Sequence, residues 1–487
     1  MRSILAIDQG TTNTKVLRVG ESGEVLAFAS RPVRTRFPAN GWVEQDPLEI
    51  LRSVSDAVAD VLQTGPPPDA IAVSNQRETV VMWDRASGRP LSPAITWQCR
   101  RAESVCQRLR SERLEPKLRR LTGLLIDPLF SAGKLAWVLE QDSVLQQRAC
   151  DGEVCCGTMD SWLIWNLTAG KQHVCDFGNA SRTQLLNITS CAWDDELLRI
   201  FGVPWAMLPD LIPSAGVLGE AKSMGLRGIP IASAVGDSHA ALAGHGVFAP
   251  GAVKATYGTG TSLLSLTRSL PTASRLASTI AWYRDGHPTY ALEGNITMSG
   301  AAVQWLGEFL QLPDPVESVL KLAGSVPDSG GITFVPAMAG LGAPHWDSAA
   351  RGTIHGLATS GTLAQLAHAA VEAIAFQVRD VFEALGEADA GAEVLFADGG
   401  ATRNESLMQL QADLLGRPVM RSACPHLSAL GAAFLAGLAT GVWSSGEEIR
   451  SLLPAPDRFD PALAADERER RICAWQSAVE RTRSRCA

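Results

Sequence analysis

Residues 4–15 of the 487-residue chain have the sequence ILAIDQGTTNTK. The apolar residues at the start predict a buried strand that ends at Asp8. Gly10 allows the backbone to approach a ligand closely, and the N–H groups and hydroxyls after it can contact phosphate oxygens. The carboxylate can reach a magnesium ion directly or through water, so the stretch is typical of a site for a metal-bound triphosphate. Because short motifs often match by chance, a β-hairpin turn that binds nothing is the alternative.

The composition is that of a globular protein, with 46% hydrophobic and 19% charged residues. The length predicts two or more domains. A net charge of −8 argues against a nucleic-acid partner, which requires a basic face. The longest apolar stretch, residues 427–443, contains glycines and is shorter than the ~20 residues of a membrane span. It predicts a tightly packed buried helix and no membrane insertion.

The ten cysteines include no C-x-x-C pair. Cys150, Cys155 and Cys156 lie close together without a histidine at zinc spacing. Buried, reduced thiols are therefore predicted. The chain enters its first strand without a signal peptide, and we expect a cytoplasmic protein.

Apolar strands that lead into glycine turns recur along the chain. A strand, an acid, a glycine and a threonine occur in this order at residues 4–12 and again at 394–402. Further strands are predicted at 15–19, 25–29 and 70–73, and helices at 51–62 and 363–385. Two more glycine turns lie at residues 235–238 and 256–261.

Four glycine turns spread over both halves favour two α/β domains facing each other across a cleft, where ligand sites are common. The boundary is expected near residues 244–251. The N-terminal domain would span residues 1–244 and the C-terminal domain residues 245–487.

The chain resembles the FGGY family of sugar and polyol kinases along nearly its whole length, and within it most resembles the glycerol kinases. The motifs that carry the resemblance are AIDQGTT (6–12), GWVEQDP (41–47), SNQRET (74–79), WQCRR (97–101), NASRT (179–183), YGTG (257–260), GLGAP (340–344) and DGGA (398–401). The fold that the resemblance implies is the actin-like ATPase fold, in which two ribonuclease-H-like α/β domains flank a deep cleft and close over ATP.

The resemblance implies an enzyme that uses ATP and Mg²⁺ to phosphorylate a terminal hydroxyl of glycerol. A kinase for a longer polyol or a ketose sugar is the alternative. A non-catalytic actin-like nucleotide-binding protein is a third reading. The implied partners are a small polyol or sugar and further copies of the chain, in a dimer or tetramer.

Phosphoryl transfer depends on positioning and charge neutralisation more than on covalent chemistry. By resemblance, Asp8 would hold the magnesium ion and Thr259 would form a second phosphate turn. Relatives usually carry Ser and Arg where this chain has Asn13 and Lys15. For Gly300, helix packing is the alternative role. The other residues implied to contact nucleotide are Thr11, Thr12, Asn13, Lys15, Gly300, Gln304, Gly400, Ala401 and Asn404.

Asp237 is the candidate catalytic residue. A substrate hydroxyl is a poor nucleophile until a nearby carboxylate takes its proton. Gly236 and Ser238 on either side allow a sharp, exposed turn. Asp is also a favoured N-cap residue, so capping of the following helix is an alternative that is compatible with catalysis.

Arg77, Glu78 and Trp97 match the polyol-binding residues of glycerol kinases. Glu accepts and Arg donates hydrogen bonds to neighbouring hydroxyls, and a Trp face covers the carbon chain. A surface ion pair is the alternative for Arg77 and Glu78, and a core position is the alternative for Trp97.

Three pocket positions depart from the glycerol kinase pattern. Leu129 stands where a Tyr is usual, Ser238 and His239 stand where two glutamines follow the catalytic acid, and Ser262 stands where a Phe is usual. These smaller side chains predict a roomier pocket with one hydrogen-bonding group changed, which favours a longer polyol or a sugar as substrate.

Overall fold

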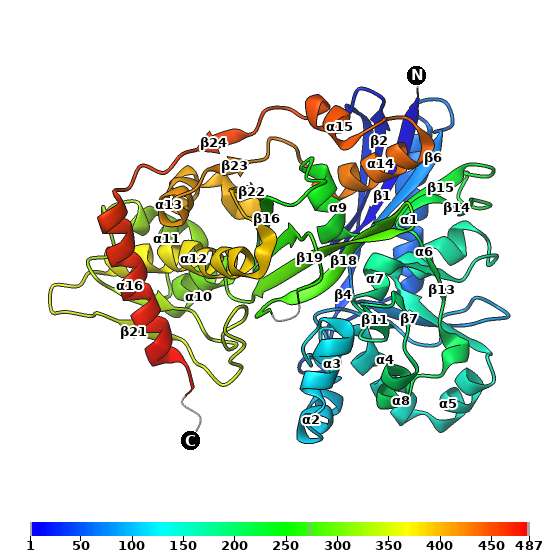
Figure 1. Ribbon diagram of the computed structural model, residues 1–487, viewed down its shortest axis with the longest axis horizontal. Coiled ribbons are helices and arrows are strands. Elements are labelled where there is room, and N and C mark those ends of the chain that lie inside the picture. Colours follow the sequence, from blue (N-terminus) through cyan, green and yellow to red (C-terminus); the bar gives the residue numbers. More distant parts are fainter. Residues whose placement is uncertain (1, 272–273, 485–487) are drawn as a thin grey trace. The chain divides into compact units, whose positions relative to one another are not determined.

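The computed structural model describes residues 2–271 and 274–484. The chain forms two compact units (Figure 1). The first comprises Met1–Phe248, Ser278–Ala291 and His426–Leu453, and the second comprises Ala249–Ala277, Leu292–Pro425 and Pro454–Ala487. The two units do not correspond to a single division of the chain after residue 244, because two segments of the C-terminal half belong to the first unit.

The first unit is built on a six-stranded sheet with the order β14-β15-β6-β1-β2-β3. Its strands are β14 (Ala215–Glu220), β15 (Pro230–Gly236), β6 (Ala70–Asn75), β1 (Ser3–Gln9), β2 (Asn13–Gly20) and β3 (Val25–Pro32). β1 pairs antiparallel with β2 and parallel with β6, which places Asp8 between Lys15 and Ser74. The strands predicted from the N-terminal sequence are confirmed.

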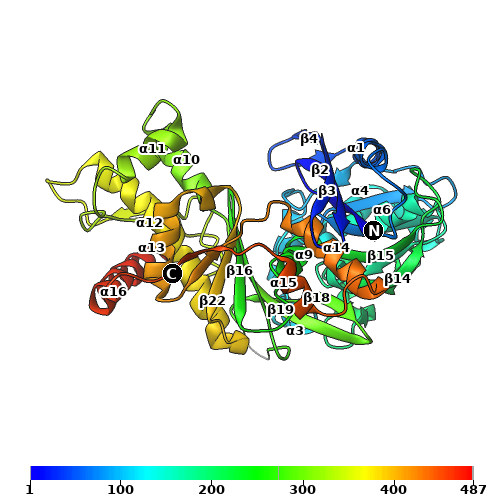
Figure 2. The ribbon, with the colours of Figure 1, turned by 90° about the horizontal axis from the view of Figure 1, so that it is seen from above.

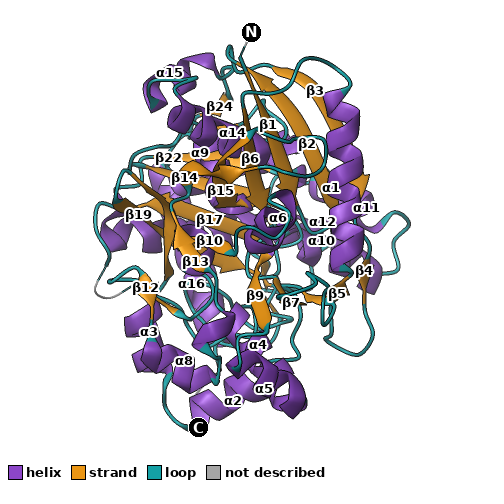
Figure 3. Cartoon of the chain, turned by 90° about the vertical axis from the view of Figure 1, so that its right-hand side faces the viewer, coloured by secondary structure: helices purple, strands orange, loops and turns teal. Residues whose placement is uncertain are grey.

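Every residue of β1 is buried, because helices cover the sheet on both faces. Helix α1 (Pro47–Leu62) runs along β1, β2 and β3, as Figure 3 shows. Its Ile50 and Val54 pack in one core with Leu5 and Ile7 of β1. Helix α14 (Leu427–Thr440) packs against β1, β6 and β15, and Figure 2 shows α1 and α14 on opposite sides of the sheet.

The predicted buried helix at residues 427–443 is confirmed as α14, but it belongs to the first unit. In Figure 1 it is the orange helix beside the blue strands β1 and β2. It packs closely on α9 (Asp237–Gly244), the helix that begins at the candidate catalytic residue. A Cβ at Gly431 would lie 1.7 Å from the Ala240 carbonyl oxygen, and a Cβ at Gly244 would lie 2.2 Å from that of Leu427. Only glycine permits such close backbone contact.

A smaller sheet and several helices complete the first unit. The smaller sheet has the order β4 (Thr35–Arg36), β5 (Glu44–Gln45), β8 (Ala94–Ile95), β7 (Val80–Asp84) and β9 (Val154–Thr158). The short strand pairs are β10 (Val174–Asp176) with β13 (Asp210–Ile212), and β11 (Leu186–Asn187) with β12 (Ala192–Trp193). The other helices are α2 (Glu103–Ser111), α3 (Glu115–Thr122), α4 (Ser131–Gln141), α5 (Ser143–Cys150), α6 (Met159–Leu167), α7 (Phe177–Ala180), α8 (Asp195–Phe201) and α15 (Gly446–Leu452).

The second unit repeats the central strand order of the first. The seven-stranded sheet that contains most of its strands has the order β18-β19-β17-β16-β22-β23-β24, and residues 278–291 of β18 and β19 are counted in the first unit. The strands are β16 (Ala252–Tyr257), β17 (Thr261–Leu266), β18 (Ala277–Arg284), β19 (His287–Ile296), β22 (Val394–Asp398), β23 (Val419–Arg421) and β24 (Asp457–Phe459), and a short pair is formed by β20 (Thr333–Val335) and β21 (Thr353–His355). The helices are α10 (Gly300–Phe309), α11 (Pro315–Ala323), α12 (Leu363–Leu385), α13 (Glu405–Leu415) and α16 (Ala465–Thr482).

The topology corrects one interpretation of the repeat. Residues 4–12 and 394–402 share a sequence pattern, but β1 continues into the antiparallel strand β2, whereas β22 leads into α13 and is followed by the parallel strand β23. The counterpart of the β1–β2 turn is the turn between β16 and β17, which also pair antiparallel. Strand direction, which a short pattern does not encode, decides the equivalence.

The prediction of buried thiols is correct for Cys155 and Cys156 but wrong for Cys150 and Cys473, which are exposed. All nine cysteines among the described residues are free. Within the described part of the chain, no helix combines the length and the apolar character that crossing a membrane requires.

The contact between α9 and α14 can be tested with Gly431→Ala. The added methyl would overlap the Ala240 carbonyl, and overpacking of a core costs about 1–3 kcal/mol or more. We expect a loss of at least about 3 kcal/mol in the free energy of unfolding, measured by urea denaturation. Gly386→Ala is the matched control, because Gly386 has a φ of −61° and no atom lies within 4 Å of a Cβ there. Equal stability of the two variants would contradict the contact.

Candidate active site

The turn that joins β1 and β2 is a β-hairpin turn, closed by a hydrogen bond from Gly10 N–H to the Asn13 carbonyl (3.0 Å). The hairpin geometry of the alternative is therefore present, and phosphate binding by this turn stays a prediction. Thr12 is exposed, and Thr11 and Lys15 are half-buried. The turn presents N–H groups, hydroxyls and a cation together, which is the chemistry that phosphate oxygens require.

Asp8 lies next to this turn and is only 7% exposed. Its Oδ1 accepts a hydrogen bond from Ser74 Oγ (2.9 Å). Burial raises the pKa of the Asp8 carboxyl, and the nearby Lys15 ammonium and the Ser74 hydroxyl partly offset the increase. Burial disfavours the ionised carboxylate, so a cation bound beside Asp8 would stabilise that ionised form.

Asp237 follows β15 and is the first residue of α9. The N-cap of this helix is Gly236, so the N-cap alternative for Asp237 is wrong. The Asp237 side chain is 36% exposed, and its Oδ1 lies 3.5 Å from Arg77 Nε. The Ser238 N–H donates to the same oxygen (2.6 Å). One carboxylate oxygen is thus engaged by the protein, and the carboxylate remains accessible to a ligand.

The pKa of Asp237 is raised to about 6. Burial is the largest cause, the Arg77 guanidinium lowers the pKa, and the negative charges of Asp8 and Glu78 raise it. A carboxyl group with this pKa is ionised at neutral pH and is a stronger base than an exposed aspartate.

Arg77 and Glu78 do not form a surface ion pair, so that alternative is wrong. They are 8% and 4% exposed. Arg77 is directed to Asp237, whereas Glu78 Oε1 accepts a hydrogen bond from Arg182 Nε (2.6 Å). Glu78 has a φ of +60°, an uncommon conformation for a non-glycine residue. The turn at Glu78 therefore directs the two neighbouring side chains to different partners.

Two residues that hold Glu78 were not assigned a role from sequence. Arg182 is fully buried and belongs to the NASRT motif at residues 179–183. Lys134 is also fully buried, and its Nζ donates to the carbonyl oxygens of Glu78 (3.0 Å) and Leu129. Burial lowers the pKa of Lys134 to about 8. Lys134 thus connects one predicted polyol-binding residue to one of the positions that depart from the family pattern.

The strand end before Arg77 is fixed by a pair of buried amides. Asn75 and Asn179 exchange two hydrogen bonds between their side chains (2.9 and 3.0 Å). Asn179 also donates to Asp176 Oδ1 (2.6 Å), and Asp176 caps the short helix α7. Burial, followed by the charge of the neighbouring Asp160, raises the pKa of Asp176 to about 7.

Trp97 is not a core residue, so that alternative is wrong. Its side chain is 38% exposed, and its indole Nε1 donates to Thr11 Oγ1 (2.9 Å). Leu129 and Ser238 are half-buried residues of the same unit. The predicted phosphate turn, the candidate base and the predicted polyol-binding residues therefore all belong to the first unit.

The second unit contains the predicted second phosphate turn. Thr259 is exposed in the turn between β16 and β17, which is closed by a hydrogen bond from Gly258 N–H to the Gly260 carbonyl (2.9 Å). Gly300 donates to the Gly258 carbonyl (3.1 Å), and a Cβ on Gly300 would lie 2.6 Å from that oxygen. Gly300 thus has the packing role given as its alternative, and this packing supports the turn.

The remaining predicted residues of the second unit lie on three elements. Gln304 is exposed on α10 and donates to Glu308 Oε1 (2.8 Å). Ser262 Oγ, on β17, is buried without a hydrogen-bond partner among the described residues. Asn404 caps α13 by accepting from Leu407 N–H (3.0 Å). No atom lies within 4 Å of a Cβ built on Gly400, and Ala401 is half-buried. The adenosine pocket stays a prediction.

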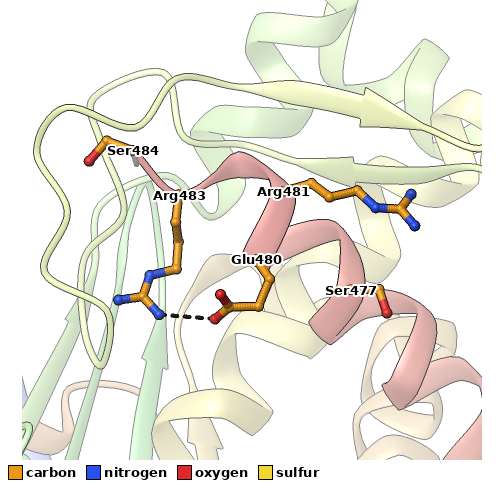
Figure 4. A pocket seen from close by; sticks show the side chains of 5 residues that line it. All are labelled: Ser477, Glu480, Arg481, Arg483 and Ser484. Atoms are coloured by element: carbon orange, nitrogen blue, oxygen red, sulfur yellow. Dashed lines mark hydrogen bonds and ion pairs between the residues drawn. The ribbon is translucent and has the colours of Figure 1, made fainter. Parts of the chain in front are cut away.

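A surface pocket of about 530 Å³ lies elsewhere, at the end of α16. Figure 4 shows that Arg481 and Arg483 extend in different directions, and Arg483 pairs with Glu480 (2.9 Å). None of the predicted site residues lines this pocket. Its polar groups do not converge on one point, so it is not the candidate active site.

A dedicated metal cage is absent from the described residues, where no three His, Cys, Asp or Glu side chains cluster suitably. Asp8 and Asp237 interact electrostatically. A single carboxylate such as Asp8 suits Mg²⁺, which is bound by one or two carboxylates, usually keeps several waters and is otherwise held by substrate phosphates.

Models of the FGGY family of carbohydrate kinases match residues 3–244 (N-terminal domain) and 253–440 (C-terminal domain). The chain belongs to this family. It is 47% identical to a glycerol kinase of Aromatoleum aromaticum over 99% of each chain. It also matches the crystal structure of Plasmodium falciparum glycerol kinase with ADP at a TM-score of 0.93 and 33% identity, covering 100% of this chain and 99% of that one. A xylulose kinase from Rhodospirillum rubrum matches at 0.89 and 25% identity, over 99% of each chain.

Family membership makes the chain a phosphotransferase that acts on an alcohol group. The predicted two-domain α/β fold, actin-like with ribonuclease-H-like domains, is confirmed.

The raised pKa of Asp237 can be tested through stability. Its folded-state pKa of about 6 lies above the ordinary value of 3.8, so the ionised carboxylate destabilises the fold above pH 6 and the cost disappears below pH 4. We expect Asp237→Asn to have a higher Tm than the wild type at pH 8, with the difference shrinking towards pH 5.

Asp84→Asn is the control, and the opposite change in Tm is expected for it. Hydrogen bonds from Ser87 are the main cause that lowers the pKa of Asp84, so this replacement should lower the Tm at pH 8. Differential scanning fluorimetry across this pH range measures both variants. A lower Tm for Asp237→Asn at pH 8 would contradict the assignment.

Proposed function

We propose that the chain transfers the terminal phosphate of ATP to a terminal hydroxyl of glycerol, giving glycerol 3-phosphate. The observation that carries the proposal is the accessible Asp237 carboxylate beside the buried pair of Arg77 and Glu78. The 47% identity to a glycerol kinase, against 25% to a xylulose kinase, favours glycerol over a ketose.

Charged side chains hold the polyol that accepts the phosphate. Glu78, which is paired with the Arg182 guanidinium at 2.6 Å, accepts hydrogen bonds from two neighbouring hydroxyls. Arg77 donates to the same polyol, and the half-exposed indole of Trp97 covers its carbon chain. Asp237 accepts the proton from the reacting hydroxyl as its oxygen bonds to the terminal phosphorus of ATP and the bond from that phosphorus to the bridging oxygen breaks, which releases ADP.

The phosphates of ATP contact the turn at residues 10–15. Lys15 and the N–H groups of the turn offset the charge of the phosphates, and Thr259 contributes the turn of the second unit. Asp8, directly or through water, would hold Mg²⁺ beside the phosphates, where the metal ion neutralises charge that develops during transfer. A purely nucleotide-binding scaffold would not need Asp237 and Glu78 at an acceptor site.

A longer polyol or a ketose is the second candidate. It is favoured by the half-buried Leu129 and Ser238 and by Ser262, each smaller than the residue usual in glycerol kinases. Lys134 holds the Leu129 carbonyl in place. A larger substrate would therefore gain room only where the Leu129 side chain is smaller than the usual Tyr.

A panel of acceptors distinguishes these candidates. Purified protein is assayed for ADP release with glycerol, a tetritol, a pentitol and a ketopentose. We expect kcat/KM to be at least about tenfold higher for glycerol, because a missing polar partner costs orders of magnitude in discrimination. A preference for the pentitol or the ketose would favour the second candidate, and no release with any acceptor would contradict both.

The role of Asp237 is tested by its pH profile. Protonation removes the base, so we expect kcat to fall below pH 6, the value expected from its pKa. Arg77 lowers this pKa, so Arg77→Met should move the fall to higher pH. Asp237→Asn should lower kcat by about 10²–10⁴-fold while isothermal titration shows unchanged ADP affinity. Unchanged turnover in Asp237→Asn would exclude the base assignment.

A further inference from the structure

We infer that a closed ring of hydrogen bonds in the first unit couples the phosphate turn to the acceptor residues, so that nucleotide and acceptor bind cooperatively. The inference rests on the proposed function for the identity of the two ligands. The ring passes through Thr11, Gln45, Gln76, Thr79 and Trp97.

One half of the ring runs from the phosphate turn to the acceptor strand through two glutamines. Gln45 Nε2 donates to the Thr11 carbonyl (2.6 Å), and Gln76 Nε2 donates to Gln45 Oε1 (2.8 Å). Gln76 directly precedes Arg77 in the chain. The amide groups therefore connect the turn that would hold phosphate to the residue that contacts Asp237.

The other half returns through Thr79 and Trp97. Thr79 Oγ1 donates to Gln76 Oε1 (2.8 Å) and accepts from Trp97 N–H (3.2 Å). The indole Nε1 of Trp97 then donates to Thr11 Oγ1 (2.9 Å), which closes the ring. Arg77 and Glu78 lie in the chain between two members of the ring, and Thr79 N–H also donates to the Arg77 carbonyl (2.8 Å).

The three central members of the ring, Gln45, Gln76 and Thr79, are fully buried. A buried amide or hydroxyl that loses its partner is not rescued by water, so its hydrogen bonds are costly to break one at a time. Their orientation is also fixed. Gln45 Nε2 faces two acceptors, Thr11 O and Thr35 Oγ1 (3.2 Å), while Gln76 Nε2 faces the oxygens of Gln45 and Gln9 (3.1 Å).

Thr11 and Trp97 are the two members of the ring that have exposed surface, and each lies at one of the two proposed ligand sites. A phosphate that contacts Thr11 fixes the carbonyl that orients Gln45, and Gln76 and Thr79 pass this on to the backbone of Trp97. The same phosphate fixes the Thr11 hydroxyl that accepts from the indole, so both routes hold Trp97 over the acceptor. By linkage, an acceptor that fixes Trp97 must improve nucleotide binding by the same factor. The first unit thus contains a route of coupling that lies wholly within one core.

The test compares two threonine replacements of the same chemistry. Thr79→Val breaks the ring, whereas Thr35→Val removes only a side branch at Gln45. The Kd of glycerol is measured by isothermal titration with and without saturating Mg·ADP. We expect ADP to tighten glycerol binding in the wild type and in Thr35→Val, and the factor to be at least threefold smaller in Thr79→Val.

Gln45→Met provides a second break in the ring if Thr79→Val does not fold. It should reduce the factor in the same way, although it also removes the Thr35 contact that Thr35→Val controls for. Equal factors in the wild type, Thr35→Val and the ring-broken variants would overturn the inference.

A measurement made without any acceptor substrate tests this inference separately from the proposed function. In protein labelled with ¹⁵N-glutamine, Mg·ADP alone should shift the side-chain amide resonance of Gln76 in the wild type and in Thr35→Val but much less in Gln45→Met. If glycerol does not bind, the proposed substrate is wrong, and this shift still decides on the ring. An unmoved Gln76 amide in the wild type overturns the ring whatever the substrate is.

Discussion

The candidate active site depends on two contacts between an arginine and an acid, in which three of the four side chains are buried. Asp237 Oδ1 lies 3.5 Å from Arg77 Nε, and Glu78 Oε1 accepts a hydrogen bond from Arg182 Nε at 2.6 Å. A buried charge is tolerated only when it is paired and hydrogen-bonded. Removal of either arginine would therefore leave its acid partner without this contact. Asp237, the proposed base, is the more accessible of the two acids.

The scaffold holds these charges by close packing of the segments that carry them. Asp237 begins α9, and α9 is held by α14 at glycine contacts that no other residue would permit. Glu78 is held from behind by the fully buried Lys134. Between the two, Asn75 and Asn179 fix the end of β6. Segments that are far apart in the sequence thus meet at one strand end, which suits chemistry that depends on positioning.

Much of the local structure followed from periodicity and turn chemistry. The apolar run before Asp8 became β1, and the helical spacing of residues 363–385 became α12. The family and the identities of Asp8, Arg77, Glu78, Trp97 and Asp237 also came from motifs, and the roles proposed for them remain to be tested. Three purely structural alternatives were excluded only by the geometry of the fold, because the burial of each side chain and its interaction partners decide these questions. Asp237 does not cap its helix, Arg77 and Glu78 do not pair on the surface, and Trp97 is not in the core.

The sequence by itself determined the α/β class, the strand and turn around Asp8 and the family, because these depend on local periodicity and on short motifs. The tertiary structure alone decided three other features. It placed α14, from the end of the chain, in the first unit. It made the β16–β17 turn the counterpart of the first turn, and it closed the ring from Thr11 through Gln76 to Trp97. Strand direction, burial and hydrogen-bond partners arise from contacts between residues distant in the chain, and no local pattern encodes them.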